Sequence, residues 1–227
     1  MTLFFCNGST ITKPEEIIPF LGGGEKHWRK GRSAYELAHS WMDANGIPNQ
    51  VRNVLETQKD FRNPKLVDGH FERETKIPGR GKASQTDLLA LCKAEGGSFI
   101  LGVEGKVAET LGDVVSDWNN GTPNRQVRLE GLVDLLGGDF TAIGNLRYQL
   151  LHRSASALLE ARNFGVSKAI MLVHSFDPGH AWFEDFEAFS EWLGAPCARP
   201  GILSDPVHLS DVDLFLGWCA DRPAPSE

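Results

Sequence analysis

The chain has 227 residues, 41% hydrophobic and 23% charged, which is ordinary for a globular protein and predicts one domain over residues 1–227. Its formal net charge of −7 excludes the broad basic surface with which proteins usually bind duplex DNA without sequence preference. Positive charge is concentrated locally, in residues 26–32 and at Arg80 with Lys82. A nucleic acid would therefore have to bind in a narrow groove. The alternative is a substrate that is small or delivered by a partner.

The four cysteines are scattered without CxxC spacing, and no secretory hydrophobic segment precedes them: Cys6, Cys92, Cys197 and Cys219. This pattern predicts free thiols in a reducing, cytoplasmic setting. No apolar run approaches the length of a transmembrane helix, so we expect no membrane partner.

The N-terminal part is expected to hold short elements. Residues 3–6 predict an edge strand, and Pro14 opens a brief helix towards Phe20. Three glycines at 22–24 precede Lys26, but the GxxxxGK[ST] pattern of a phosphate loop is missing. A flexible connector is the better interpretation of this segment.

The first firm helix is predicted over residues 33–45. Ser33 as N-cap with Glu36 three positions later is a capping box, and Gly46 ends the helix. A short helix at 50–58 and a first sheet strand at 70–77 follow. The turn at 78–82 is rich in glycine and positive charge, and either a phosphate-contacting loop or a solvated surface turn explains it.

Residues 86–93 and 98–108 predict a β-hairpin around the turn at 94–97. Side chains alternate along a strand, so Glu104 and Lys106 share one face while Phe99, Leu101 and Val103 share the other. If residues 95 and 96 are the central turn residues, position 87 pairs with position 104; if 96 and 97 are central, it pairs with 106. Both registers bring Asp87 onto the face of Glu104 and Lys106.

Two carboxylates about 5 Å apart on paired strands repel each other. A divalent cation would reverse the sign of that interaction, and hard oxygen ligands indicate Mg²⁺ or Mn²⁺ rather than zinc. The sequence therefore predicts a metal-binding site at this hairpin.

Beyond the hairpin the pattern alternates between helices and strands. Thr122 and Pro123 predict an N-cap and first-turn proline, and the longest helix is expected over 143–163. A buried strand at 168–175, a helix at 181–193, a strand at 214–219 and a frayed tail at 223–227 follow. His174 and His180 straddle a turn without a third ligand, so they are interpreted as structural.

Asp87 followed by Glu104-Gly105-Lys106 resembles the D…(D/E)xK signature of the restriction-endonuclease-like superfamily, the PD-(D/E)xK phosphodiesterases. Thr86 stands where the family's name has proline. The longer pattern SQTDLL…VEGKV…RYQLLHR…MLVHSF resembles uncharacterised bacterial members over about residues 33–176. The resemblance implies an α/β fold with a mixed central sheet flanked by helices and an α-β-β-β-α-β core, with N- and C-terminal additions.

The resemblance also implies a metal-dependent phosphodiester hydrolase, a nuclease acting on DNA or RNA. Asp87, Glu104 and the Gly105 carbonyl would hold Mg²⁺ or Mn²⁺, and Lys106 would act on the attacking water. Gln149 matches in kind a glutamine that many members carry on the helix after the ExK strand, while His152 and Arg153 are weaker candidates. Glu36 matches an acidic residue of the first helix, although its capping role already explains it.

Gly102 and Ala108 are expected to leave room for substrate above the sheet. The alternative is a non-catalytic binding or assembly module in which Lys106 only neutralises the two acids. Hydrolysis of another substrate class, a homodimer and a protein partner all stay open.

Overall fold

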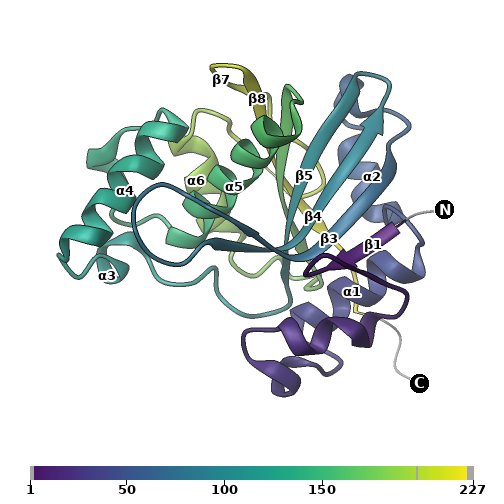
Figure 1. The fold of residues 1–227 in the computed structure, drawn as a ribbon. Coiled ribbons are helices and arrows are strands. Elements are labelled where there is room, and N and C mark those ends of the chain that lie inside the picture. Colours follow the sequence, from purple (N-terminus) through teal and green to yellow (C-terminus); the bar gives the residue numbers. More distant parts are fainter. Residues whose placement is uncertain (1–2, 198, 224–227) are drawn as a thin grey trace.

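A computed structural model describes residues 3–197 and 199–223, which form one mixed eight-stranded sheet with helices on both faces (Figure 1). The strand order is β2-β1-β3-β4-β5-β6-β8-β7. The pairs β1/β3, β5/β6 and β6/β8 are parallel, and the other neighbours are antiparallel. The strands are β1 Leu3–Cys6, β2 Ser9–Ile11, β3 Lys65–Thr75, β4 Ser84–Ala94, β5 Gly97–Lys106, β6 Lys168–Ser175, β7 Val207–Leu209 and β8 Val212–Ala220.

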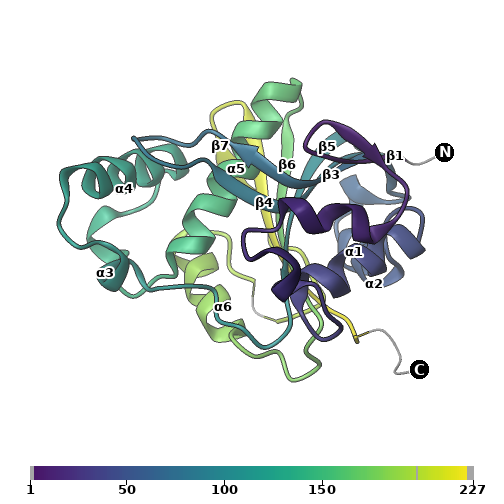
Figure 2. The ribbon, with the colours of Figure 1, turned by 60° about the horizontal axis from the view of Figure 1, so that its bottom comes forward.

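The helices divide between the two faces of this sheet (Figures 1 and 2). They are α1 Ser33–Asp43, α2 Asn49–Leu55, α3 Val115–Trp118, α4 Pro123–Leu136, α5 Tyr148–Phe164 and α6 Phe183–Trp192. Short 3₁₀ helices are Pro14–Phe20, Gly24–His27, Lys59–Phe61 and Phe140–Ala142. Helices α1 and α2 cover one face, and α5 covers the other, where α6 packs next to β8 and α4 packs on the outer side of α5.

Two buried clusters result, one on each face of the sheet. On the α1/α2 face, Trp41 and Phe61 belong to one cluster with Phe99, Leu101 and Val103 of β5. On the α4/α5/α6 face, Leu151, Phe186 and Trp218 belong to the second cluster. The alternation predicted for β5 is therefore confirmed: Leu101 and Val103 lie under α1 and α2, and Glu104 points to the face of α5.

The hairpin has the first of the two registers allowed by the sequence. Ala94 pairs with Gly97 and Leu88 with Val103, so residues 95 and 96 form the turn and position 87 falls opposite position 104. The turn packs on the segment before β3, where Gly96 donates its N–H to the Asp60 carbonyl at 2.9 Å. This contact anchors the turn, and the two-residue turn length sets the face on which Glu104 lies.

Several predicted boundaries need correction. The strand β1 lies one position inside the sheet edge, because β2 folds back and pairs with it. The strand predicted at 70–77 begins earlier, at Lys65. The longest helix begins at Tyr148, five residues later than predicted, because residues 143–147 form a turn and Arg147 pairs with Val114 in an isolated β-bridge. The predicted tail falls mostly outside the described residues, of which 223 is the last.

The capping box predicted at the start of α1 is wrong. Arg32 is the N-cap, Ser33 already lies inside the helix, and no side chain caps it. The Glu36 carboxylate instead accepts the N–H of Gly31 at 2.7 Å and is 2% exposed. This bond satisfies a backbone donor of the segment leading into the helix.

The helices and the four cysteines of the fold bear on the expectations about membranes and thiols. Among residues 3–197 and 199–223, no helix combines the length and the apolar character needed to cross a bilayer. All four cysteines are buried and free, as predicted.

Candidate active site on β4, β5 and α5

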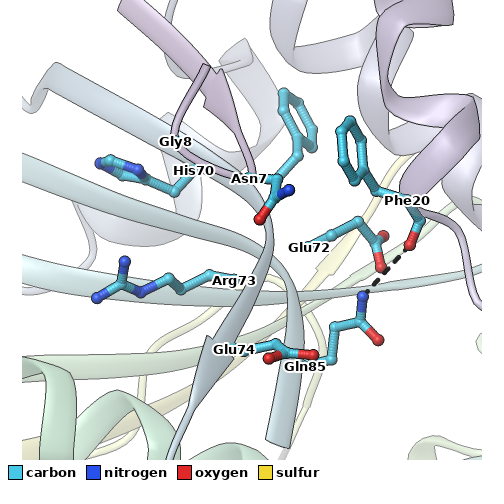
Figure 3. A pocket seen from close by; sticks show the side chains of 9 residues that line it. Asn7, Gly8, Phe20, His70, Glu72, Arg73, Glu74 and Gln85 are labelled. Carbon is cyan, nitrogen blue, oxygen red and sulfur yellow. Dashed lines mark hydrogen bonds between the residues drawn. The ribbon is translucent and has the colours of Figure 1, made fainter. Parts of the chain in front are cut away.

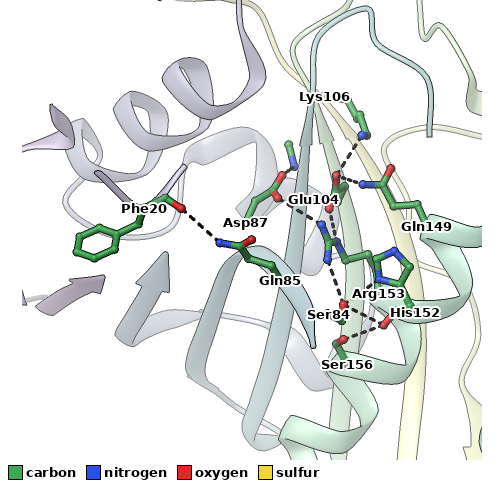
Figure 4. Close-up of polar contacts among 11 residues, drawn as sticks. Phe20, Ser84, Gln85, Asp87, Glu104, Lys106, Gln149, His152, Arg153 and Ser156 are labelled. Carbon is green, nitrogen blue, oxygen red and sulfur yellow. Dashed lines mark hydrogen bonds and ion pairs between the residues drawn. The ribbon is translucent and has the colours of Figure 1, made fainter. Parts of the chain in front are cut away.

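Asp87 and Glu104 project from neighbouring strands onto the face covered by α5 (Figure 4). The Asp87 side chain is 24% exposed, whereas that of Glu104 is 4% exposed. The Oδ2 atom of Asp87 accepts the N–H of Gly105 at 2.9 Å. The hairpin thus places the two carboxylates on one face, as the sequence predicts, and one of them is partly accessible while the other is buried.

Glu104 is saturated with donors. Its Oε1 atom lies 3.0 Å from Lys106 Nζ and accepts from Gln149 Nε2 at 2.6 Å, while Oε2 accepts from Arg153 Nε. Gln149 and Arg153 lie one turn apart on α5, so both point down onto the sheet. Burial disfavours the ionised form of Glu104, but the charges of Arg153 and Lys106 outweigh it and hold the pKa below its usual range.

Asp87 has the opposite balance. Burial, followed by the nearby charge of Glu104, raises its pKa to about 7. Arg153 Nη2 is 3.6 Å from Oδ1 of Asp87, too far to offset this effect fully. The negative charge of Asp87 is therefore only partly compensated, although Arg153 lies between the two acids.

A third carboxylate, Glu72 of β3, was not predicted. Phe71 pairs with Leu88 and Arg73 with Thr86, so Glu72 falls opposite Asp87. Its φ of +54° is unusual for a residue within a strand. Burial, then the charge of Asp87, raises the Glu72 pKa to about 8.

Glu72 lines a pocket of about 320 Å³ between β3 and the turn that joins β1 to β2 (Figure 3). There Gln85 donates to the Phe20 carbonyl at 3.4 Å. Glu72 also lines the pocket at Asp87. The alternating pattern of residues 70–77 indicates a strand, but only the β3–β4 register identifies this residue as a neighbour of Asp87.

The oxygen atoms of the site suit a hard divalent cation. Asp87 and Glu104 supply carboxylates, and Oε1 of Gln149 is buried without a hydrogen-bond partner in the described part of the chain. Arg153 lies between the carboxylates, and within residues 3–197 and 199–223 no group of three or more His, Cys, Asp or Glu is arranged to hold a metal ion. Carboxylate and amide oxygens are ligands of the type that Mg²⁺ and Mn²⁺ prefer, and in this arrangement Arg153 contacts both acids.

Behind Arg153, a hydrogen-bonded chain leads to His152. Arg153 Nη1 donates to Ser84 Oγ at 3.1 Å, and Ser84 Oγ lies 2.8 Å from His152 Nδ1. Burial, then the charge of Arg153, lowers the His152 pKa to about 3, so this imidazole is neutral.

A pocket of about 360 Å³ lies over Asp87 and extends towards α4. The rings of Trp118 and Tyr148 stack on its wall with centroids 3.7 Å apart. The residues around it come from β3, β4, α3, α4, α5 and the loop before β4: Glu72, Ile77, Lys82, Ala83, Ser84, Gln85, Asp87, Trp118, Arg128, Tyr148, His152 and Arg153.

Other sequence candidates lie elsewhere. Gly102 does not leave room for substrate; a Cβ there would lie 3.3 Å from that of Ala157, so the glycine lets α5 approach the sheet. His174 is buried, accepts from Trp41 Nε1 at 3.3 Å and lies 3.2 Å from Asp221, which supports a structural role. Of the loop at 78–82, Lys82 reaches the pocket.

One family model matches the chain, over residues 10–223, and its description is Domain of unknown function (DUF6946). No curated protein and no solved structure matches in the corresponding comparisons. Because the match covers the whole sheet from β3 to β8 together with the candidate site, the chain belongs to the DUF6946 family.

Proposed function

We propose that this protein is a Mg²⁺- or Mn²⁺-dependent phosphodiester hydrolase that acts on nucleic acid. The observation that carries the proposal is the pair of carboxylates on adjacent strands, with Lys106 Nζ 3.0 Å from Glu104. Asp87, whose pKa is raised to about 7 by burial and then by Glu104, is short of positive charge at this point. A pair of neighbouring acids, one of them with a strongly raised pKa, beside a pocket is typical of a functional site.

The element order also supports a restriction-endonuclease-like core. When α2, α3 and α4 are treated as insertions, helix α1, strands β3, β4 and β5, helix α5 and strand β6 have the order α-β-β-β-α-β. The proposed site lies where members of that superfamily carry theirs, on the second and third of these strands.

The proposed roles follow from the contacts. Asp87, Glu104 and the Gly105 carbonyl would hold the cation, which when bound would polarise a phosphodiester and lower the pKa of a nearby water. Lys106 orients that water and offsets negative charge developing on the phosphorus oxygens. Gln149 fixes the Glu104 rotamer through its 2.6 Å hydrogen bond, and Arg153 supplies positive charge for the phosphate.

One observation favours a second function, a non-catalytic binding module. Both oxygens of Glu104 already have partners in Lys106, Gln149 and Arg153, as in a structural ion cluster. In such a module the acids would serve the fold and would gain nothing from a cation.

Nuclease assays with Mg²⁺ or Mn²⁺ test the two functions. We expect cleavage of single-stranded DNA or RNA by the wild type and its loss in Asp87→Ala, Glu104→Ala and Lys106→Ala. Glu95→Gln, in the exposed turn at the far end of the same hairpin, is the matched control and should cleave normally. Cleavage by all three alanine variants, or no cleavage by the wild type on any nucleic acid, would remove the enzyme proposal.

A further inference from the structure

The end of the pocket away from Asp87 is built around a buried arginine. Arg128 of α4 is 9% exposed and lines the pocket. It donates from Nη2 to the Lys82 carbonyl at 2.9 Å and hydrogen-bonds the Tyr148 side chain, while its Nε is buried without a partner in the described residues. None of the ion pairs among residues 3–197 and 199–223 involves Arg128.

A buried guanidinium without a carboxylate is costly, because burial removes the water that would stabilise its charge. The same guanidinium is shaped to bind two oxygens of one anion at once. Arg128 therefore indicates that an anion completes this end of the pocket.

The loop before β4 is shaped to the same arginine. A Cβ at Gly79 would lie 2.8 Å from the Arg128 Cα, and one at Gly81 would lie 3.1 Å from Arg128 Nη2. Both glycines also have positive φ, +80° and +126°. The loop thus wraps closely round Arg128 and carries Lys82 to the wall of the pocket.

His152 adds an imidazole to the wall of the pocket. Ser84 Oγ accepts a hydrogen bond from Arg153, and it lies 2.8 Å from His152 Nδ1 and 3.5 Å from the His152 carbonyl oxygen, so Nδ1 is the nearer acceptor for the Ser84 proton. A neutral imidazole has one N–H, which is then on Nε2. That Nε2–H has no protein acceptor in the described part of the chain and lies on a side chain that lines the pocket.

We propose that Arg128, Lys82 and His152 form a binding site for a phosphate group of the substrate, next to the site where a phosphodiester is cleaved. The inference rests on the proposed function and names its substrate class: a nucleic-acid strand with consecutive phosphates, rather than a small isolated diester. A pocket of about 360 Å³ has room for one nucleotide unit.

The aromatic wall explains why phosphate, and not a base, is recognised. Tyr148 covers one face of Trp118, and the guanidinium of Arg125 lies 4.8 Å from the Trp118 ring centroid. Tyr148 in turn contacts His152, with ring centroids 4.9 Å apart. These rings are therefore not a free platform for base stacking, and binding should be independent of base sequence.

Titration calorimetry with inorganic phosphate in EDTA, near neutral pH, tests the site without metal or turnover. We expect the wild type to bind phosphate, Arg128→Met to bind about tenfold more weakly or worse, and Lys82→Ala several-fold more weakly. Arg80→Ala is the matched control, because this exposed arginine is in the same loop but does not line the pocket. Equal binding by the wild type and Arg128→Met, or an equal loss in Arg80→Ala, would overturn the proposal.

If Arg128→Met does not fold, the double variant Lys82→Ala/His152→Phe decides instead, and unchanged phosphate affinity in it would overturn the site. A second measurement uses a single-stranded oligonucleotide: Lys82→Ala should lower the slope of log affinity against log salt by about one. An unchanged slope would contradict a phosphate contact by Lys82. If the wild type binds phosphate but hydrolyses no nucleic acid, only the proposed enzymatic function is refuted. If it hydrolyses nucleic acid but its phosphate binding does not depend on Arg128, only this phosphate site is refuted.

Discussion

Replacing Asp87 with asparagine removes a negative charge that the folded protein compensates poorly. Burial and the charge of Glu104 raise the pKa of Asp87 from 3.8 to about 7. Asparagine keeps a side-chain oxygen that accepts the Gly105 N–H, so the change acts mainly on charge. We therefore expect the Asp87→Asn protein to be more stable than the wild type when no metal is bound.

The size and pH dependence of this effect follow from the pKa values. A pKa difference of one unit equals 1.36 kcal/mol, so a rise from 3.8 to about 7 corresponds to at most about 4 kcal/mol. Because Asp87 is 24% exposed and water screens part of the repulsion, we expect about 2–4 kcal/mol. For an acid with a raised folded pKa, wild-type stability falls as pH rises from 3.8 to about 7 and is then level.

Denaturant unfolding in EDTA, followed across this pH range, measures the effect. The variant should gain about 2–4 kcal/mol above pH 7 and lose this advantage below about pH 4. Asp134→Asn, at an exposed position of α4, is the control and should change stability by less than about 0.5 kcal/mol. Mg²⁺ at a hundredfold excess over its Kd should stabilise the wild type by about 2.7 kcal/mol and Asp87→Asn much less. An Asp87→Asn protein no more stable than the wild type above pH 7 would refute the reasoning.

Three further changes test the frame around the site. Glu104→Gln should lower the free energy of unfolding by about 3 kcal/mol, because Arg153 and Lys106 lose their shared carboxylate. If denaturant unfolding shows that this variant is more stable than the wild type, the ion cluster does not stabilise the fold. Gly96→Ala should lower the free energy of unfolding by about 1–3 kcal/mol in the same assay, because the added Cβ would lie 2.6 Å from the Asp60 carbonyl oxygen. Unchanged stability would argue against this contact of the hairpin turn. Gly102→Val should displace α5 and reduce any nuclease activity more than Gly102→Ala, and equal activities would show that α5 does not need this close approach.

The sequence predicted the central part of the fold because those signals are local. Strand alternation and a glycine-containing turn placed Asp87, Glu104 and Lys106 on one face, and the structure has one of the two allowed registers. Apolar periodicity likewise identified α4, although it placed the start of α5 too early. There, Ile143 and Leu146 have a spacing that suits the apolar face of a helix, but they lie in the turn that precedes α5.

The remaining features depend on contacts between distant segments. Glu72 enters the site only through the pairing of β3 with β4, which the eight-residue connection between them does not specify. Nothing in the sequence of α4 marks Arg128 as special. It is buried by the loop before β4, where its partner Lys82 lies forty-six positions earlier in the sequence. A pattern of residues within one element carries no information about such partners.

The hydrogen bonds of His174 bear on how the protein is handled at its C-terminal end. Trp41 Nε1 donates to Nδ1 of this buried imidazole, so its Nε2–H faces the Asp221 carboxylate. A chain shortened to end at Ala220 would leave that N–H without its acceptor and would also lose the bond from Asp221 N to the Ser175 carbonyl. Affinity tags or fusion partners joined after residue 223 preserve both bonds. A chain ending before Trp218 would also lose the strand pairing of Trp218, Cys219 and Ala220 with β6.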